Sequence, residues 1–205
     1  MPLIIEDEIK TNGTANTDLT ITCGTEKTII LTTPVWEDLR APATAVRLPA
    51  SGFYNPAETE YKGGIVLAFG DEATNEEEIG ILFQLPHTYK EGTNIYPHVH
   101  WVGEDNTTAN VKWGLEYSWT NVGVAFPTTT TIYVIDANAA TDVHNMASFT
   151  AITGTGKTVS SMLICRLFRN SSSVDDTFTG KSAYLLEFDI HFQIDTIGSR
   201  TETAK

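Results

Sequence analysis

The chain has 205 residues, and its 13 basic and 26 acidic side chains give a formal net charge of −13. A chain of this charge is repelled by nucleic-acid phosphates and by anionic membrane surfaces, and no cluster of lysine or arginine offsets the repulsion. Neither a nucleic acid nor a membrane is therefore expected as a partner, and no apolar run approaches the roughly 20 residues of a membrane-spanning helix.

The composition favours a single all-β domain. Threonine, isoleucine and valine account for 31, 17 and 12 residues, and these β-branched side chains fit a pleated sheet better than a helix. The length suits one domain of about 150–200 residues. Cys23 and Cys165 are far apart and lack metal-ligand spacing, so they predict two reduced, buried thiols in a chain made in the cytoplasm.

Residues 1–33 differ from the rest of the chain. Two short alternating runs, 18–23 and 27–31, are joined by a Gly-Thr-Glu turn, which is typical of a β-hairpin. An isolated hairpin buries too little apolar surface to be stable alone. We therefore expect 1–33 to form an extended N-terminal β arm that attaches to another protein. The alternative is that it adds edge strands to the main sheet.

From residue 34 onward, short stretches rich in β-branched and aromatic residues recur at intervals of about 10–15 residues, separated by loops rich in Gly, Asn and Thr. A few residues near 34–39 or 71–78 fit a short helix instead. The spacing predicts a jelly-roll-like antiparallel β-sandwich body over residues 34–205. The expected strands are 43–48, 64–69, 79–85, 94–102, 110–119, 129–135, 147–152, 158–169 and 182–195.

Two of these strands show the clearest alternation. Residues 111–119 and 184–194 carry aromatic or aliphatic side chains at every second position. This period of two marks a strand with one face in the core. The opposite face of the last strand carries Glu187, Asp189 and His191. The predicted core residues on the two strands are Trp113, Leu115, Tyr117, Leu186, Phe188, Ile190 and Phe192.

One set of residues is similar to a metal-binding motif. Gly92, His98, His100 and Glu104 have the spacing G-x5-H-x-H-x3-E, which resembles the first motif of the cupins. His98 and His100 point to the same face of a strand, and two imidazoles with a carboxylate suit iron, manganese or zinc. However, Val111 stands where that motif has its next glycine, and the second cupin motif is absent.

The alternative for His98 and His100 is structural, because hydrogen bonds or a neighbouring subunit can satisfy paired histidines. His191 is available as a third imidazole, although nothing in the sequence places it beside the pair. We therefore expect no bound cofactor, and a metal held by His98, His100 and Glu104 is the alternative.

Other catalytic patterns are weaker. Residues 151–158 match a relaxed phosphate-binding loop, but the residues that follow favour a strand and not the helix that such a loop requires. No G-x-S-x-G elbow marks a serine nucleophile. Glu187 with Asp189 is a carboxylate pair of a kind that any acidic β-protein contains. Trp113 and Trp119, which could stack on a sugar, fall on a predicted core face. The chain is therefore predicted not to be an enzyme.

Several longer phrases resemble a known family of proteins. They are LPHTYKEG at 85–92, YPHVHW at 96–101, WGLEY at 113–117, SSMLICRLFR at 160–169, LEFDIHFQID at 186–195 and GSRTE at 198–202. Together they resemble a family of mostly uncharacterised proteins of tailed bacteriophages and viral metagenomes, over about residues 33–205.

This resemblance implies a virion component, namely a head-decoration, head-fibre or tail-associated protein. Such a protein is expected to be a jelly-roll homotrimer that acts by protein–protein assembly without catalysis. It would be assembled in the host cytoplasm, with its N-terminal arm bound to other virion proteins. Two alternatives stay open: a cupin-like metal-binding protein or enzyme that uses His98, His100 and Glu104, and a carbohydrate-binding adhesion module.

Overall fold

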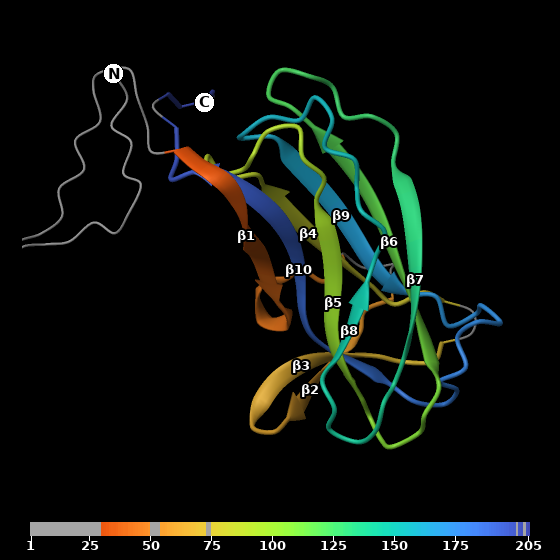
Figure 1. The fold of residues 1–205 in the computed structure, drawn as a ribbon. Helices are drawn as coiled ribbons and strands as arrows, with labels where there is room; N and C mark the ends of the chain where they lie inside the picture. Colours follow the sequence, from red (N-terminus) through yellow and green to blue (C-terminus); the bar gives the residue numbers. More distant parts are fainter. Residues whose placement is uncertain (1–29, 50–53, 73–74, 200, 203) are drawn as a thin grey trace, which may run out of the picture.

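The computed structural model describes residues 30–49, 54–72, 75–199, 201–202 and 204–205, which form two antiparallel β-sheets packed face to face (Figure 1). The six-stranded sheet contains β1 (Ile30–Pro42), β2 (Ala57–Tyr61), β3 (Gly64–Phe69), β5 (Tyr96–Gly103), β8 (Asn145–Ser148) and β10 (Ala183–Thr196). The four-stranded sheet contains β4 (Glu78–Gln84), β6 (Asn110–Thr120), β7 (Thr130–Ala137) and β9 (Met162–Arg169). No helix within these ranges is long and apolar enough to cross a bilayer.

The order of the strands is that of a jelly roll. The pairs β1–β10, β4–β9, β5–β8 and β6–β7 are nested inside one another along the chain, as in an antiparallel ribbon that is rolled into two sheets. The β2–β3 hairpin is an insertion between β1 and β4, and β3 pairs with the beginning of β10. The predicted jelly-roll-like β-sandwich is therefore confirmed.

Most predicted strands agree with the structure to within a few residues, and the differences have local causes. Residues 34–39 are part of β1, because this stretch is stabilised by its ladder with β10 and not by its own helical propensity. Residues 43–48 hold a 3₁₀ turn at Ala43–Ala45 in place of a strand. The acidic strand β2 was not predicted. The predicted arm lies outside the described residues up to residue 29, and β1 already begins at Ile30.

The space between the sheets is filled largely by aromatic side chains. Trp101, Trp113 and Phe69 are fully buried, and the rings of Phe69 and Trp113 pack edge to face with their centroids 5.2 Å apart. Edge-to-face packing lets the positive ring edge meet the negative ring face. The predicted core residues Trp113, Leu115, Phe188, Ile190 and Phe192 are buried, and Tyr117 is partly buried and packs against this core.

The prediction for Leu186 is wrong, because β10 contains a β-bulge. The pairing with β5 shifts between Leu185 and Glu187, so Leu186 is an extra residue in the ladder. Leu185 is fully buried in its place, and Leu186 lines a groove on the outer face of the sheet. Beyond the bulge the alternation resumes with Phe188 inward.

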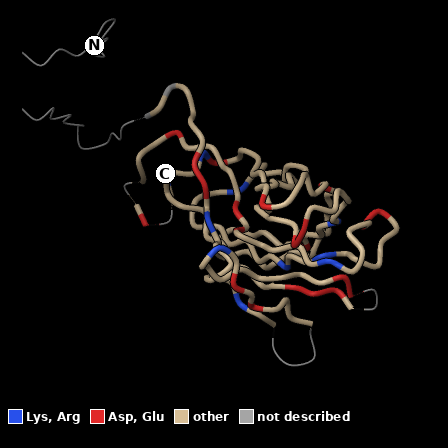
Figure 2. Tube along the Cα trace, turned by 90° about the horizontal axis from the view of Figure 1, so that it is seen from below, with Lys and Arg blue, Asp and Glu red and all other residues tan. Residues whose placement is uncertain are grey.

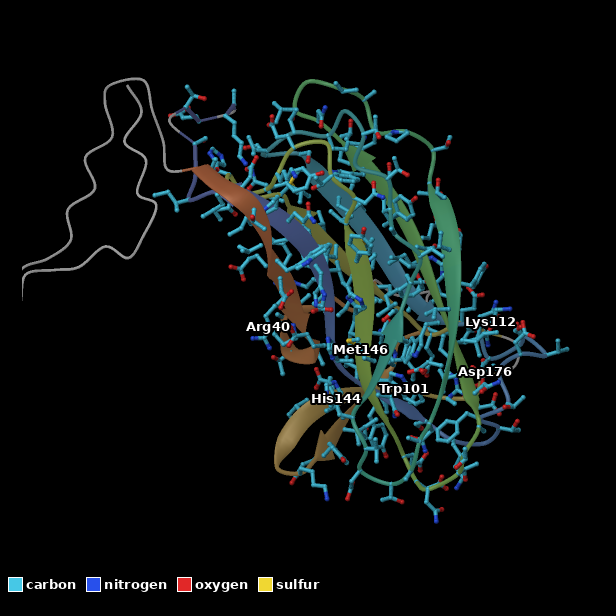
Figure 3. The ribbon with its side chains drawn as sticks, viewed as in Figure 1. Arg40, Trp101, Lys112, His144, Met146 and Asp176 are labelled. Atoms are coloured by element: carbon cyan, nitrogen blue, oxygen red, sulfur yellow. The ribbon has the colours of Figure 1, made fainter. Side chains whose placement is uncertain are left out.

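A buried arginine fixes the end of β9 to the loop that precedes β10. The guanidinium of Arg169 is bidentate to Asp176, with nitrogen–oxygen distances of 2.7 and 2.9 Å, and both side chains are almost fully buried. It also donates to the carbonyl oxygens of Phe69, Phe178 and Lys181. Asp176 accepts a further hydrogen bond from the Lys112 backbone, so the pair joins β3, β6, β9 and the loop; Lys112 and Asp176 are labelled in Figure 3.

We predict that Phe188→Ala lowers the free energy of unfolding by about 3–5 kcal/mol, because it leaves a cavity next to Phe83 in the closed core. The matched variant Leu186→Ala should cost less than about 1.5 kcal/mol, because its side chain faces the outer groove. Denaturant titration of both variants measures the difference. Equal losses would contradict the bulge.

We also predict that Arg169→Met costs about 3–5 kcal/mol, because it leaves the Asp176 carboxylate buried without its counter-charge. Arg166 lies on the same strand and pairs with Glu76, Glu78 and Glu116 at a partly exposed position. Arg166→Met should therefore cost clearly less than Arg169→Met in the same denaturant assay. The reverse order would show that the buried pair is not the stronger contact.

Candidate metal centre

The outer face of the six-stranded sheet carries an array of ionisable side chains. Opposed residues of antiparallel strands point to the same face, so the register decides which groups meet. Asp189 of β10 lies opposite His98 of β5 and Arg40 of β1. One step along in each direction, the opposed sets are His191 with Tyr96 and Asp38, and Glu187 with His100 and Pro42.

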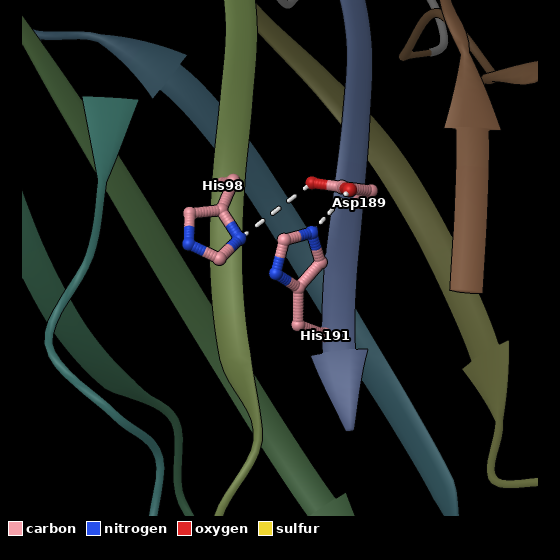
Figure 4. Close-up of side chains that lie close together, drawn as sticks. All are labelled: His98, Asp189 and His191. Atoms are coloured by element: carbon pink, nitrogen blue, oxygen red, sulfur yellow. Dashed lines mark hydrogen bonds and ion pairs between the residues drawn. The ribbon is translucent and has the colours of Figure 1, made fainter. Parts of the chain in front are cut away.

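At the centre of this array, two imidazoles converge on one carboxylate (Figure 4). His98 Nδ1 lies 3.8 Å from Asp189 Oδ1, and His191 Nε2 lies 3.1 Å from Asp189 Oδ2. The two imidazole rings have their centroids 4.1 Å apart. One ligand atom from each of the three residues lies within 4.8 Å of the other two. This set of nitrogen and oxygen donors is of the kind that binds transition metals.

Burial leaves part of this cluster without hydrogen bonds. Asp189 is 3% exposed and His98 is 8% exposed. Asp189 Oδ1 and His98 Nδ1 face each other, and neither has a hydrogen-bond partner among the described residues. An unpaired buried polar atom costs the free energy of its lost hydration, so the two atoms favour a ligand that would satisfy both.

Further groups flank the three residues. His100 Nε2 lies 3.4 Å from Asp189 Oδ1, and His100 Nδ1 lies 2.7 Å from Nε2 of His144 in the loop before β8. Asp38 Oδ1 of β1 lies 3.2 Å from His191 Nε2. Arg40 of β1 and His144, which line the same groove, are labelled in Figure 3. Four of the five histidines of the chain therefore gather on one face of the sheet.

The electrostatics of the cluster keep the carboxylate charged. Burial pushes the pKa of Asp189 upward, but its contact with His100 and the charges of the three nearby histidines outweigh burial and hold this pKa below its ordinary value. The contact with Asp189 raises the pKa of His100. Burial, followed by repulsion from His191, lowers the pKa of His98.

An open groove of about 420 Å³ lies over the cluster. Arg40 and Glu187 form one side of it, joined by two hydrogen bonds of 2.5 and 2.6 Å. Asp189 and His191 reach its floor, so a ligand in the groove can contact the cluster. The lining residues are Asp38, Arg40, His100, His144, Leu186, Glu187, Asp189 and His191.

The structure brings together only part of the predicted site. His98 and His100 share a face and both contact Asp189, whereas Glu104 lies beyond the end of β5 and accepts a hydrogen bond from the Ser182 backbone. Glu104 is therefore near the start of β10, and Asp189 lies well along that strand. The sequence singled out the outward face of β10, but it could not show which strand pairs with it.

The structure also bears on three other features of the sequence. Residues 151–158 form a loop before β9, and a Cβ on Gly154 would lie 1.7 Å from the carbonyl oxygen of Thr93, so close backbone packing requires this glycine. Trp113 and Trp119 are buried and Trp36 is 55% exposed. Cys165 is a free buried thiol whose pKa is raised by burial, and Cys23 lies outside the described residues.

Comparisons with known proteins do not assign the chain to a family. No family model and no curated protein matches it. The CBM36-1 domain of a multidomain xylanase from the hindgut metagenome of Trinervitermes trinervoides is a similar solved structure, with 10% identity over 75% of this chain and 96% of that one, and a TM-score of 0.38. Dimeric latent PorU from Porphyromonas gingivalis has 12% identity over 85% of this chain and 14% of that one, with a TM-score of 0.37.

The CBM22-1-GH10 modules of Clostridium thermocellum xylanase 10B, complexed with xylohexaose, have 13% identity over 83% of this chain and a TM-score of 0.35. This chain spans 27% of that xylanase structure. With TM-scores and identities this low, none of these likenesses carries an argument about the function of the chain.

Proposed function

We propose that the chain is a non-enzymatic structural component of a tailed-phage virion, which acts by assembling with copies of itself and with other virion proteins. The support from sequence is the resemblance of several long phrases to proteins of tailed phages. The jelly roll agrees with this proposal but does not decide it, because viral capsid proteins, lectins and cupins all use this architecture.

The geometric support is an apolar strip on the outer face of the four-stranded sheet. Leu82 of β4 and Ile164 of β9 are opposed in the ladder, and they are 62% and 41% exposed. On β7 of the same sheet, Tyr133 and Ile135 are nearly half exposed, but the ion pair of Arg166 with Glu116 separates them from this strip. Adjacent exposed apolar side chains of this kind are typical of a surface that another protein covers.

Charge limits the kind of contact that this face can make. The net charge of −13 opposes the approach of two copies, and acidic positions are spread along the trace and outnumber the basic ones (Figure 2). Apolar contact must therefore overcome the repulsion, and the assembly should persist at high salt, where the repulsion is screened. Three copies are the preferred number, because the phage resemblance implies a trimer.

We predict that light scattering gives a mass of about three chains in both low and high salt. Leu82→Asp should reduce this mass, because it places a charge in the apolar strip. The control Ile65→Asp changes a residue that is 52% exposed on β3 of the other sheet, and it should leave the mass unchanged. A wild-type mass of one chain at micromolar concentration would contradict the proposal. Glycan-array binding by such a monomer would favour the carbohydrate-binding alternative.

We predict that residues 1–29 are needed for attachment and not for folding, since the sandwich that the structure describes begins with β1 at Ile30. A chain that begins at residue 30 should keep a cooperative thermal transition and its self-association, but lose binding to purified virions that lack this protein. An insoluble or molten product would show that the arm belongs to the core.

A further inference from the structure

We propose that His98, Asp189 and His191 form a binding site for a divalent transition-metal cation of the zinc class. Its protein ligands would be His98 Nδ1, His191 Nε2 and the Asp189 carboxylate. This set of residues differs from the one expected from the cupin-like spacing, because Asp189 and His191 of β10 take the place of His100 and Glu104. The proposal is independent of virion assembly, which we assign to the opposite face of the sandwich.

The distances agree with a metal at the centre of the three residues. Zinc is bound at about 2.0–2.2 Å with tetrahedral geometry, so its ligand atoms lie about 3.4 Å from one another. The two separations, 3.8 Å from His98 Nδ1 to Asp189 Oδ1 and 3.1 Å from His191 Nε2 to Asp189 Oδ2, lie on either side of that value and end on the two oxygens of the carboxylate. Taken with one atom from each residue, the three donors lie within 4.8 Å of one another.

The unpartnered atoms point to the same centre. His98 Nδ1 and Asp189 Oδ1 face each other and both are buried without a hydrogen bond, which leaves a charged carboxylate only partly compensated. A cation between them would satisfy both atoms in one step. A bridging water is the competing explanation, because water can donate to Asp189 and to a neutral His98.

The surroundings support a cation in preference to an anion. Asp38 Oδ1 lies 3.2 Å from the same Nε2 of His191, so it adds a second carboxylate oxygen beside the proposed centre, and His100 Nε2 lies 3.4 Å from Asp189 Oδ1. The nitrogen donors favour zinc, cobalt or iron over calcium and magnesium, which prefer oxygen ligands. The groove above the cluster leaves the remaining coordination positions open to water or to a small anionic ligand.

The test uses the untagged full chain after dialysis against a chelator, because a histidine tag would bind zinc by itself. Calorimetry with ZnCl2 should give one site per chain, and CaCl2 should give no heat. CoCl2 should produce the visible absorption bands of a tetrahedral site. His191→Gln should weaken zinc binding by at least about 100-fold, since even outer-shell changes cost up to about 100-fold.

His87→Gln is the matched control, because His87 contacts Ser160 and Ser199 and lies outside the cluster. It should bind zinc like the wild type, and the melting of each metal-free variant verifies that it is folded.

Absence of zinc binding by the wild type would overturn the proposal and favour the bridging water. A loss caused by His144→Gln and not by His191→Gln would also overturn it, because the metal would then lie between His100 and His144. Neither result would alter the light-scattering mass, so the metal and assembly proposals fail separately.

Discussion

The register of β10 with β1 and β5 decides which ionisable side chains meet on the outer face of the six-stranded sheet. The ladder sets Asp189 between His98 and Arg40, and it sets His191 next to Asp38. A slip of one residue would turn all of these groups to the other face of the sheet. The slip is opposed by Phe188, Ile190 and Phe192, which are buried on the inner face of the same strand. The core therefore positions the cluster.

The bulge in β10 allows this long strand to point apolar side chains into the core along its whole length. Before the bulge, Leu185 packs in the core opposite Trp101 of β5; after it, Phe188 packs opposite Val99. Without the extra residue, one half of the strand would bury its ionisable side chains. Arg169 and Asp176 fix the loop that leads into β10, so the strand enters the sheet at a defined position.

The two faces of the sandwich carry different chemistry. The outer face of the six-stranded sheet has the histidine–carboxylate cluster and its groove, and the outer face of the four-stranded sheet has Leu82 and Ile164 beside each other. A cation on the first face would offset the negative charge of the Asp189 carboxylate. Contact with another protein on the second face would cover apolar surface. Because the two features lie on opposite faces, a bound cation would leave the apolar contact surface free.

The sequence predicted the fold well and the site only in part. Period-two alternation is local, so it identified the strand near residues 111–119 and the inward face at Phe188. Ladder pairing is a long-range property, and nothing along the chain indicates that residue 98 lies opposite residue 189. For the same reason the spacing motif named Glu104, which is close to His100 in sequence, and missed Asp189, Asp38 and His144. The bulge at Leu186 leaves no pattern in composition, because Leu185 and Leu186 are equally apolar.

A crystal structure of the zinc-soaked protein, with data collected on both sides of the zinc absorption edge, tests the central claim most directly. We expect one strong anomalous peak within bonding distance of His98 Nδ1, His191 Nε2 and Asp189, on the outer face of β5 and β10. A peak between His100 and His144, or a register in which His98 does not face Asp189, would contradict this account.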